Sequence, residues 1–394
     1  MSKEQLEATR SLLSHIDSFN LEDYIKAIRF DELKVPSVPF LLPQQKYYYG
    51  VSGQQQAELN FLKAAVLSKG TGPVFLYSDM EMADMAEDKE FSKKWMYGLA
   101  LLLKKGVKLQ YVHNLNRPFD ELMLGLESLI PLYMTGQIEP YYLSGVQNEV
   151  FQHIYRVSDS VALFGESIHG YHEDGWYHVT ANKEEVARYR READHILGHA
   201  HSLMDIYQEK DTESLQRFIR TIANGDYITE LISSSLPPYG MTTALMEEIC
   251  RENGCTQAEQ DKVLNYINLC EENLQQQLSA GIPLTIEIPD IREEDFEKES
   301  PALNLSPLFL GRKISYSPAQ YRRHREALEK QVSANELLSL TANPKAAFRN
   351  MDICISKGKW VWISKHSHPN IHFVIHYSKL REAIENMILP IYEE

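Results

Sequence analysis

Residues 71–117 show the clearest pattern of apolar and polar positions in the chain. Two short apolar runs, 74–77 and 107–112, follow glycine-containing turns and have the length of strands. Between them, apolar side chains recur at helical spacing, at Phe91, Trp95, Leu99, Leu102 and Leu103. The pattern predicts two parallel strands joined by a right-handed crossover helix, with Trp95 buried against the sheet.

Polar residues follow both predicted strands. Ser78 and Asp79 come after the first, and His113 and Asn114 come after the second. Ligands in open α/β sheets bind at the carboxyl edge of parallel strands, where these groups would meet. Arg117 adds a guanidinium that can hold a carboxylate or phosphate. We interpret these five residues as a candidate ligand-binding edge. The alternative, that Ser78 and Asp79 only cap the next helix, stays open.

Similar patterns predict elements along the rest of the chain. Two amphipathic helices are expected within 3–30 and a long helix from about 183 to 207. Further strands are expected at 46–49, 138–143, 176–179 and 371–375, and hairpins at 150–164 and 353–363. The order of hairpin, strand and helix therefore occurs twice, which favours two similar halves, although no residue identity supports a duplication.

These patterns divide the chain into five segments. They are N-terminal helices and a linker (1–45), a first α/β half (46–207), an all-helical insertion (208–280), an irregular connection (281–317) and a second α/β half (318–394). The predicted fold class is α/β, with a mixed, largely parallel sheet, crossover helices, two similar halves and a helical insertion.

Composition places the chain among globular proteins. Its 394 residues are 43% hydrophobic and 24% charged, which suits a buried core. No apolar stretch approaches the length of a membrane span and no secretory signal is visible, so we expect a cytoplasmic protein with no membrane association. The four cysteines contain no C-x-x-C pair and are expected to be free thiols.

Charge and motifs argue against several classes of function. The formal net charge of −15 repels a nucleic-acid backbone. The stretch 243–267 resembles helix-turn-helix only superficially, because its second helix begins with Glu259 and Asp261. Direct nucleic-acid binding is therefore not expected. The chain also lacks G-x-G-x-x-G, Walker and G-x-S-x-G motifs, so nucleotide cradles and a hydrolase elbow lack their signatures.

Two groups of histidines raise the question of a metal. They are His195, His199 and His201 on a predicted helix, and His366, His368, His372 and His376 in the tail. The first group lacks the adjacent glutamate of a metalloprotease, and no cysteine or paired carboxylate flanks the second. We therefore favour a solvated helix face for the first group, and a sheet edge near solvent for the second group, over a metal site. We expect neither a metal nor another cofactor.

Two stretches, 95–143 and 358–387, resemble the C-terminal effector or sensor region of bacterial XRE-type helix-turn-helix transcriptional regulators. The resemblance runs from about residue 17 to the end and implies an effector-sensing or interaction module. XRE regulators carry a five-helix DNA-binding domain before this region. Residues 1–16 are too few to hold one, which is a departure from the pattern.

The order of strands and helices is also loosely similar to phospholipase D-like folds. Those enzymes use H-x-K-x-x-x-x-D, in which histidine attacks phosphorus and lysine holds its oxygens. None of the fourteen histidines here has a lysine two residues later. The phosphodiesterase chemistry is therefore not expected.

Two hypotheses about function follow. The first is a non-catalytic, cytoplasmic regulatory or effector-sensing protein that binds a small ligand or a protein partner and could form a homodimer. The alternative is an enzyme that acts on a small polar or anionic substrate at the edge between Asp79 and His113.

Overall fold

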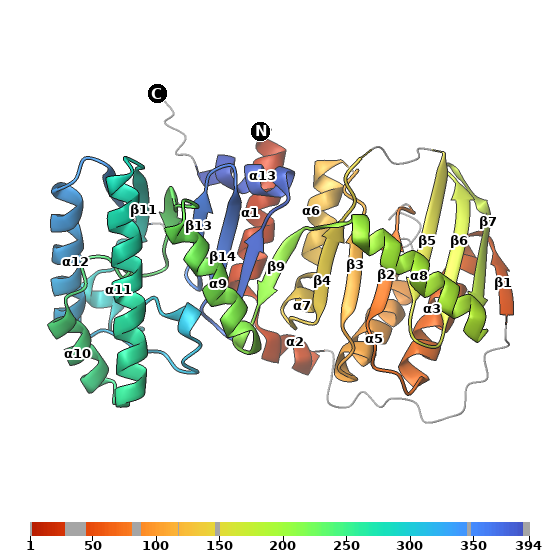
Figure 1. The fold of residues 1–394 in the computed structure, drawn as a ribbon, viewed down its shortest axis with the longest axis horizontal. Coiled ribbons are helices and arrows are strands. Elements are labelled where there is room, and N and C mark those ends of the chain that lie inside the picture. The colour runs from red at the N-terminus through yellow and green to blue at the C-terminus, as the bar shows by residue number, and fades with distance from the viewer. Residues whose placement is uncertain are drawn as a thin grey trace. The chain divides into compact units, whose positions relative to one another are not determined.

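The computed structural model describes residues 2–27, 45–80, 88–116, 118–145, 150–344 and 348–388. The chain divides into two units. The first unit is Leu21–Met204, and the second unit is Met1–Asn20 together with Asp205–Glu394. Each unit contains one mixed β-sheet with helices (Figure 1). The predicted α/β fold class is therefore confirmed.

Within the described part of the first unit, eight strands form a sheet with the order β1-β7-β6-β5-β2-β3-β4-β8. The pairs β2–β3 and β3–β4 are parallel, and the other pairs in this order are antiparallel. The strands are β1 (Gln45–Tyr49), β2 (Val74–Ser78), β3 (Leu109–His113), β4 (Ile138–Tyr142), β5 (Phe151–Val157), β6 (Ala162–Ile168), β7 (Tyr171–Thr180) and β8 (His201–Ser202).

The predicted strand–helix–strand unit is confirmed. Helix α5 (Lys89–Lys104) connects β2 to β3, whose register runs from Val74 opposite Leu109 to Tyr77 opposite Val112. Asp88 caps α5 by accepting hydrogen bonds from the backbone N–H groups of its first turn. The other helices in the described part of this unit are α2 (Leu21–Ala27), α3 (Gly50–Leu67), α6 (Phe119–Ser128), α7 (Ile130–Tyr133) and α8 (Lys183–His199).

Trp95 does not lie where the sequence pattern placed it. The side chain is only partly buried, and its indole Nε1 donates a 2.9 Å hydrogen bond to Oε2 of Glu58 on α3. Glu58 also forms a buried ion pair with Arg156 of β5, at 3.4 Å. Trp95 therefore connects α5 to the buried pair that Glu58 of α3 forms with Arg156 of β5. The expectation that Trp95 is a buried core residue against the sheet is wrong.

In the second unit, seven strands of the described residues form a sheet with the order β12-β11-β10-β13-β14-β15-β9. The pairs β10–β11 and β11–β12 are parallel, whereas β10–β13, β13–β14 and β14–β15 are antiparallel. The strands are β9 (Met204–Tyr207), β10 (Glu230–Ile232), β11 (Leu284–Pro289), β12 (Leu338–Asn343), β13 (Met351–Ser356), β14 (Trp360–Lys365) and β15 (Ile371–Ile375).

Helices from both ends of the chain contribute to the second unit. The N-terminal helix α1 packs against α13, burying one face that includes Leu12, Leu13 and Ile16. The helices are α1 (Lys3–Ser18), α9 (Thr212–Ala223), α10 (Thr243–Glu252), α11 (Gln257–Ser279), α12 (Pro318–Ser333) and α13 (Ser378–Ile388). None of the helices in the described ranges combines the length and the apolar character needed to cross a membrane.

The two sheets share one topology. The run β7-β6-β5-β2-β3-β4 in the first unit has the same pairing directions as β15-β14-β13-β10-β11-β12 in the second. Helices α8 and α13 follow the equivalent strands β7 and β15. The two units are therefore similar in strand order and pairing, with β2 equivalent to β10 and β5 to β13, although β10 and β11 lie before residue 318, where the second predicted half begins.

Three stretches differ from the sequence patterns. The stretch 208–280 is not wholly helical, because β10 lies within it and pairs with β11 and β13. The stretch 281–317 contains β11, whose buried Leu284, Ile286 and Ile288 alternate with polar positions between two prolines. Helix α8 ends at His199, before the expected end near 207, and short strands follow it.

Candidate functional site

The predicted edge of the first unit has the expected backbone but different side-chain partners. Because β2 and β3 are parallel neighbours, Asp79 and His113 lie at adjacent strand ends. Phe75 and Val112 belong to one apolar cluster, and side chains alternate faces along a strand. Asp79 is an even number of residues from Phe75, whereas His113 directly follows Val112. The two side chains therefore belong to opposite faces of the sheet.

The structure brings His153, rather than His113, to Asp79. The Asp79 carboxylate accepts hydrogen bonds from the backbone N–H of His153 and from the Tyr77 hydroxyl, the latter at 3.1 Å. The His153 ring lies 4.0 Å from Asp79 and 3.3 Å from Glu166 of β6. The Asp79 carboxylate, followed by that of Glu166, raises the pKa of His153 despite its partial burial.

The other predicted residues that the structure describes have partners away from Asp79. His113 is buried, and its Nε2 lies 3.0 Å from the Tyr133 hydroxyl. Ser78 accepts a hydrogen bond from the backbone of Met80, and Asn114 accepts one from the backbone of Asn116, as in short capping turns. Arg117 lies outside the described residues. The grouping of Asp79 with His113 is therefore replaced by a cluster of Asp79, His153 and Glu166.

The second unit contains a cavity of about 1010 Å³. Its lining comes from residues that follow β10, from the segment between β11 and α12, from residues around the end of β12 and the start of β13, and from residues that follow β14. The cavity thus lies at the carboxyl edge of the parallel strands β10, β11 and β12. This is the edge at which open α/β sheets bind ligands.

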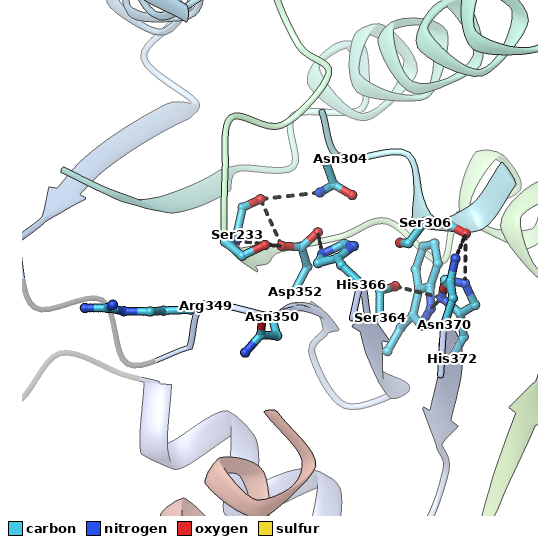
Figure 2. Close-up of polar contacts among 12 residues, drawn as sticks. Ser233, Asn304, Ser306, Arg349, Asn350, Asp352, Ser364, His366, Asn370 and His372 are labelled. Carbon is cyan, nitrogen blue, oxygen red and sulfur yellow. Dashed lines mark hydrogen bonds and ion pairs between the residues drawn. The ribbon is translucent and has the colours of Figure 1, made fainter. Parts of the chain in front are cut away.

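A contact between a buried carboxylate and an imidazole lies beside this cavity. Asp352, on β13, is 2% exposed, and its Oδ2 lies 2.8 Å from Nε2 of His366, which lines the cavity. The other oxygen, Oδ1, accepts hydrogen bonds from the Ser233 hydroxyl and from the backbone and hydroxyl of Ser234. Figure 2 shows Asp352 between Ser233 and His366, with Asn304 reaching Ser233.

The charge of Asp352 is maintained by these partners. Burial alone would raise the pKa of the carboxyl, but the nearby His366 and the hydrogen bonds from Ser234 outweigh it and lower the pKa. Asp352 is therefore a carboxylate at neutral pH, and its position on β13 corresponds to that of His153 on β5. Both units thus hold a carboxylate–histidine pair at the equivalent corner of the sheet.

A second polar group lies on the same side of the sheet, around Ser306. The Ser306 carbonyl accepts a 3.2 Å hydrogen bond from Asn370 and lies 3.4 Å from Nε2 of His372 (Figure 2). The His372 ring is fully buried, and its Nδ1 accepts from the Trp362 indole and contacts the Ser364 hydroxyl. Burial lowers the pKa of His372 to about 3, so the imidazole is neutral.

Several buried polar atoms beside the cavity have no hydrogen-bond partner within the described part of the chain. They are Oγ of Ser235, Oγ of Ser306 and Oδ1 of Asn370, and all three residues line the cavity. Ser235 and Ser306 are 6% and 7% exposed. Buried polar atoms in proteins are nearly always hydrogen-bonded, and leaving one without a partner costs free energy. These atoms can form hydrogen bonds with water or with a polar group in the cavity.

The charged residues of the cavity wall are mostly paired with opposite charges. The pairs are Asp290 with Arg325, Glu299 with Lys313, Asp295 with Lys298, and Arg312 with Glu259. The pairing leaves hydroxyl and amide groups to provide most of the specific polar contacts.

The histidine groups do not assemble a metal centre in the ranges that the structure describes. Nδ1 of His199 contacts the backbone carbonyl of His195, one helical turn earlier. His366 and His372 have the separate partners described above, and His376 pairs with Asp205 at 2.9 Å. No group of three or more His, Cys, Asp or Glu side chains among the described residues has a metal-binding arrangement. The four cysteines are free thiols.

Sequence reasoning missed the cavity because its lining comes from distant segments. Ser306 lies in a proline-containing segment that was expected to be an irregular connection. The nearest signal was the even spacing of His366, His368 and His372, which places them near one sheet edge. Asp352 and Ser233 carried no local signal, because they meet only when β10 pairs with β13.

Comparison with known proteins gives limited information. No family model matches the chain. A search of curated proteins also finds no match. Among the solved structures that match is TrmBL2, an archaeal chromatin protein, at 12% identity and a TM-score of 0.31; the match covers 46% of this chain and 61% of TrmBL2.

Two further structures are NucT from Helicobacter pylori and polyphosphate kinase from Porphyromonas gingivalis. NucT is 14% identical with a TM-score of 0.27, and the match covers 40% of this chain and 98% of NucT. The kinase is 12% identical with a TM-score of 0.28, and the match covers 89% of this chain and 54% of the kinase. At these TM-scores the likeness carries no conclusion about function.

Proposed function

We propose that this chain is a non-catalytic regulatory protein that senses a small, uncharged polar ligand in the cavity of the second unit. The observation that carries the proposal is the set of unpartnered buried polar atoms on Ser235, Ser306 and Asn370, all of them lining one cavity. A cytoplasmic location and a protein partner that receives the signal belong to the same proposal.

The size and position of the cavity support a small-molecule ligand. Ligand pockets commonly have volumes of about 300–1,000 Å³, and this cavity is at the upper end of that range, at about 1010 Å³. It also lies at the carboxyl edge of three neighbouring strands, two pairs of which are parallel.

The unpartnered atoms define the chemistry of the ligand. Oδ1 of Asn370 can only accept a hydrogen bond, whereas the hydroxyls of Ser235 and Ser306 can donate or accept. A ligand that bears hydroxyl or amide groups would satisfy all three. Asp295 pairs with Lys298 and Glu299 with Lys313 within the wall, and Asp290 pairs with Arg325, so we propose an uncharged polar ligand.

The resemblance to XRE-type effector regions supports a regulatory role over a catalytic one. The absence from the sequence of any histidine followed two residues later by lysine supports the same choice, since phospholipase D-like chemistry needs that pair.

A thermal-unfolding titration of the purified protein tests this proposal. The probes are a panel of uncharged polyols and amides, with organic phosphates for comparison. We expect saturable stabilisation by an uncharged compound, because a ligand that binds only the folded state raises its stability. Stabilisation by the phosphates alone would contradict the proposed ligand class.

Two serine variants provide matched controls. The Ser306 hydroxyl has no hydrogen-bond partner among the described residues, so Ser306→Ala should leave the stability of the ligand-free protein unchanged and weaken the response to the ligand. The Ser158 hydroxyl of the first unit accepts and donates hydrogen bonds within a turn, so Ser158→Ala should lower stability and leave the response unchanged. Equal effects of both variants on the response would contradict the assignment of the site.

A second candidate function is acid–base catalysis at Asp79, His153 and Glu166 in the first unit. The observation that favours it is the imidazole of His153 between two carboxylates, which raise its pKa above the ordinary value for histidine, the side chain most often used for proton transfer. Turnover of a small polar substrate that is abolished by His153→Ala and retained in Ser306→Ala would favour this enzyme over the sensor.

A further inference from the structure

Helix α1 is joined to the wall of the cavity through Asp17. The Asp17 carboxylate accepts hydrogen bonds from the backbone N–H of Asn350, at 2.8 Å, and of Arg349, at 3.2 Å. Arg349 and Asn350 line the cavity immediately before β13. One carboxylate at the end of α1 therefore holds a stretch of the cavity rim.

A buried lysine makes a second connection between the same two parts. Nζ of Lys365 donates to the Asp17 carbonyl, at 2.9 Å, and to the hydroxyl of Ser367, which lines the cavity. The Lys365 side chain is fully buried, and its burial lowers its pKa to about 8. Such a lysine depends on these acceptors, because few other groups compensate its lost hydration.

The residues that Asp17 contacts also contact the Asp352–His366 pair beside the cavity. The Asn350 carbonyl, next to the N–H that Asp17 holds, accepts a 2.7 Å hydrogen bond from the backbone N–H of His366. His366 in turn pairs with Asp352. Asn350 is thus hydrogen-bonded both to Asp17 and to His366 of the Asp352–His366 pair.

We propose that α1 controls access to Ser306 in the cavity wall, with Asp17 as the positioning residue that holds the rim in place while α1 is docked. An isolated helix of this length is only marginally stable in water, so α1 depends on its docked face for its structure. Undocking α1 would remove the acceptors of Asn350, Arg349 and Lys365 together and release the rim. The regulatory role rests on the proposed function: ligand binding and α1 docking then strengthen each other, because coupling between two sites is reciprocal.

The test measures how fast a thiol in the cavity wall reacts with 5,5′-dithiobis(2-nitrobenzoic acid) in the full-length protein. Ser306→Cys places that thiol, and the substitution is mild because the serine hydroxyl has no hydrogen-bond partner in the part of the chain that the structure describes. The rate is compared with Asp17 intact, in Asp17→Ala and in Asp17→Asn. Glu7→Ala is the matched control, since Glu7 is an exposed acidic residue of α1 whose ion pair is with Lys3.

We expect Asp17→Ala to raise the rate at position 306 by at least about tenfold, a factor that corresponds to about 1.4 kcal/mol. Asp17→Asn keeps the Oδ1 acceptor and should restore most of the protection, and Glu7→Ala should have no effect. The fully buried native Cys250 should keep its low reactivity in every variant.

Two results would overturn the proposal. One is an equal rate in Asp17→Ala and Glu7→Ala. The other is a parallel rise in the reactivity of Cys250, which would indicate general destabilisation instead of rim opening. The thiol reagent needs no natural ligand, so this test is independent of ligand binding. If Asp17→Ala raises the rate but the protein binds no polar compound, the proposed role of α1 stands and only the proposed sensor function is rejected.

Discussion

Nε2 of His366 lies 2.8 Å from Oδ2 of Asp352, and this pair connects the cavity to the interior of the sheet. Asp352 is buried on β13, whereas His366 follows β14 and lines the cavity. Ser233 and Ser234 hold the other carboxylate oxygen from the end of β10. The ends of β10, β13 and β14 therefore meet at the Asp352 carboxylate. Because this carboxylate holds three segments together, the fold should be sensitive to its substitution.

Removing the Asp352 carboxylate should destabilise the protein strongly. Asp352→Ala removes the carboxylate that contacts His366 and leaves the Ser234 backbone N–H without its acceptor, so we expect a loss of roughly 3 kcal/mol in the free energy of unfolding. Urea denaturation measures this loss. Asp352→Asn keeps an acceptor oxygen and should lose less. A loss below about 1 kcal/mol in Asp352→Ala would show that the pair does not stabilise the sheet.

Trp95 should contribute through its hydrogen bond rather than as a core residue. Trp95→Phe removes the donor to the buried Glu58 and should cost about 1–2 kcal/mol in the free energy of unfolding. Tyr97→Phe is the control, since Tyr97 lies on the same helix and is 44% exposed. Equal effects of the two substitutions in thermal denaturation would be inconsistent with the contact to Glu58.

The buried imidazole of His372 should make stability depend on pH. The pKa of His372 is about 3 in the folded state, against an ordinary value of 6.5. Between pH 6.5 and pH 3, His372 is therefore protonated in the unfolded chain and neutral in the folded chain. The contribution of His372 is fully present above pH 6.5 and is lost as the pH falls toward 3, at up to about 1.4 kcal/mol per pH unit. Urea denaturation at pH 7, 6, 5 and 4 should show a flatter profile for His372→Asn than for the wild type. Parallel profiles would mean that another group is responsible.

The protein should show no appreciable affinity for duplex DNA at physiological salt. Its formal net charge of −15 opposes the counterion release that drives such binding. A mobility-shift assay at several salt concentrations checks this expectation. Tight binding that weakens steeply with salt would reveal a basic surface that overrides the net charge.

Local patterns in the sequence predicted the elements whose contacts are close in sequence. The crossover between β2 and β3 follows from two apolar runs and a helical stripe, and the structure confirms it. Strand β11 was missed because Pro283 and Pro289 suggested an irregular connection, although Leu284, Ile286 and Ile288 alternate between them.

The site was harder to predict because its contacts are distant in sequence. Asp79 was identified as a polar strand end, but its partner His153 comes from β5, which pairs with β2 only in the folded sheet. Asp17 and Asn350 are 333 residues apart. The rule that ligands bind at the carboxyl edge of parallel strands led to the first unit, whereas the cavity of the second unit lies at the equivalent edge of the other sheet.

Native mass spectrometry of the freshly purified full-length protein tests the proposed ligand site most directly. We predict a population with one small, uncharged molecule bound per chain, and a smaller bound population in Ser306→Ala than in Ser158→Ala prepared in the same way. Two results would contradict the assignment of this cavity as a ligand site. One is a bound population that Ser306→Ala leaves unchanged. The other is ligand-free mass in every preparation, together with no stabilisation by any polyol or amide of the panel.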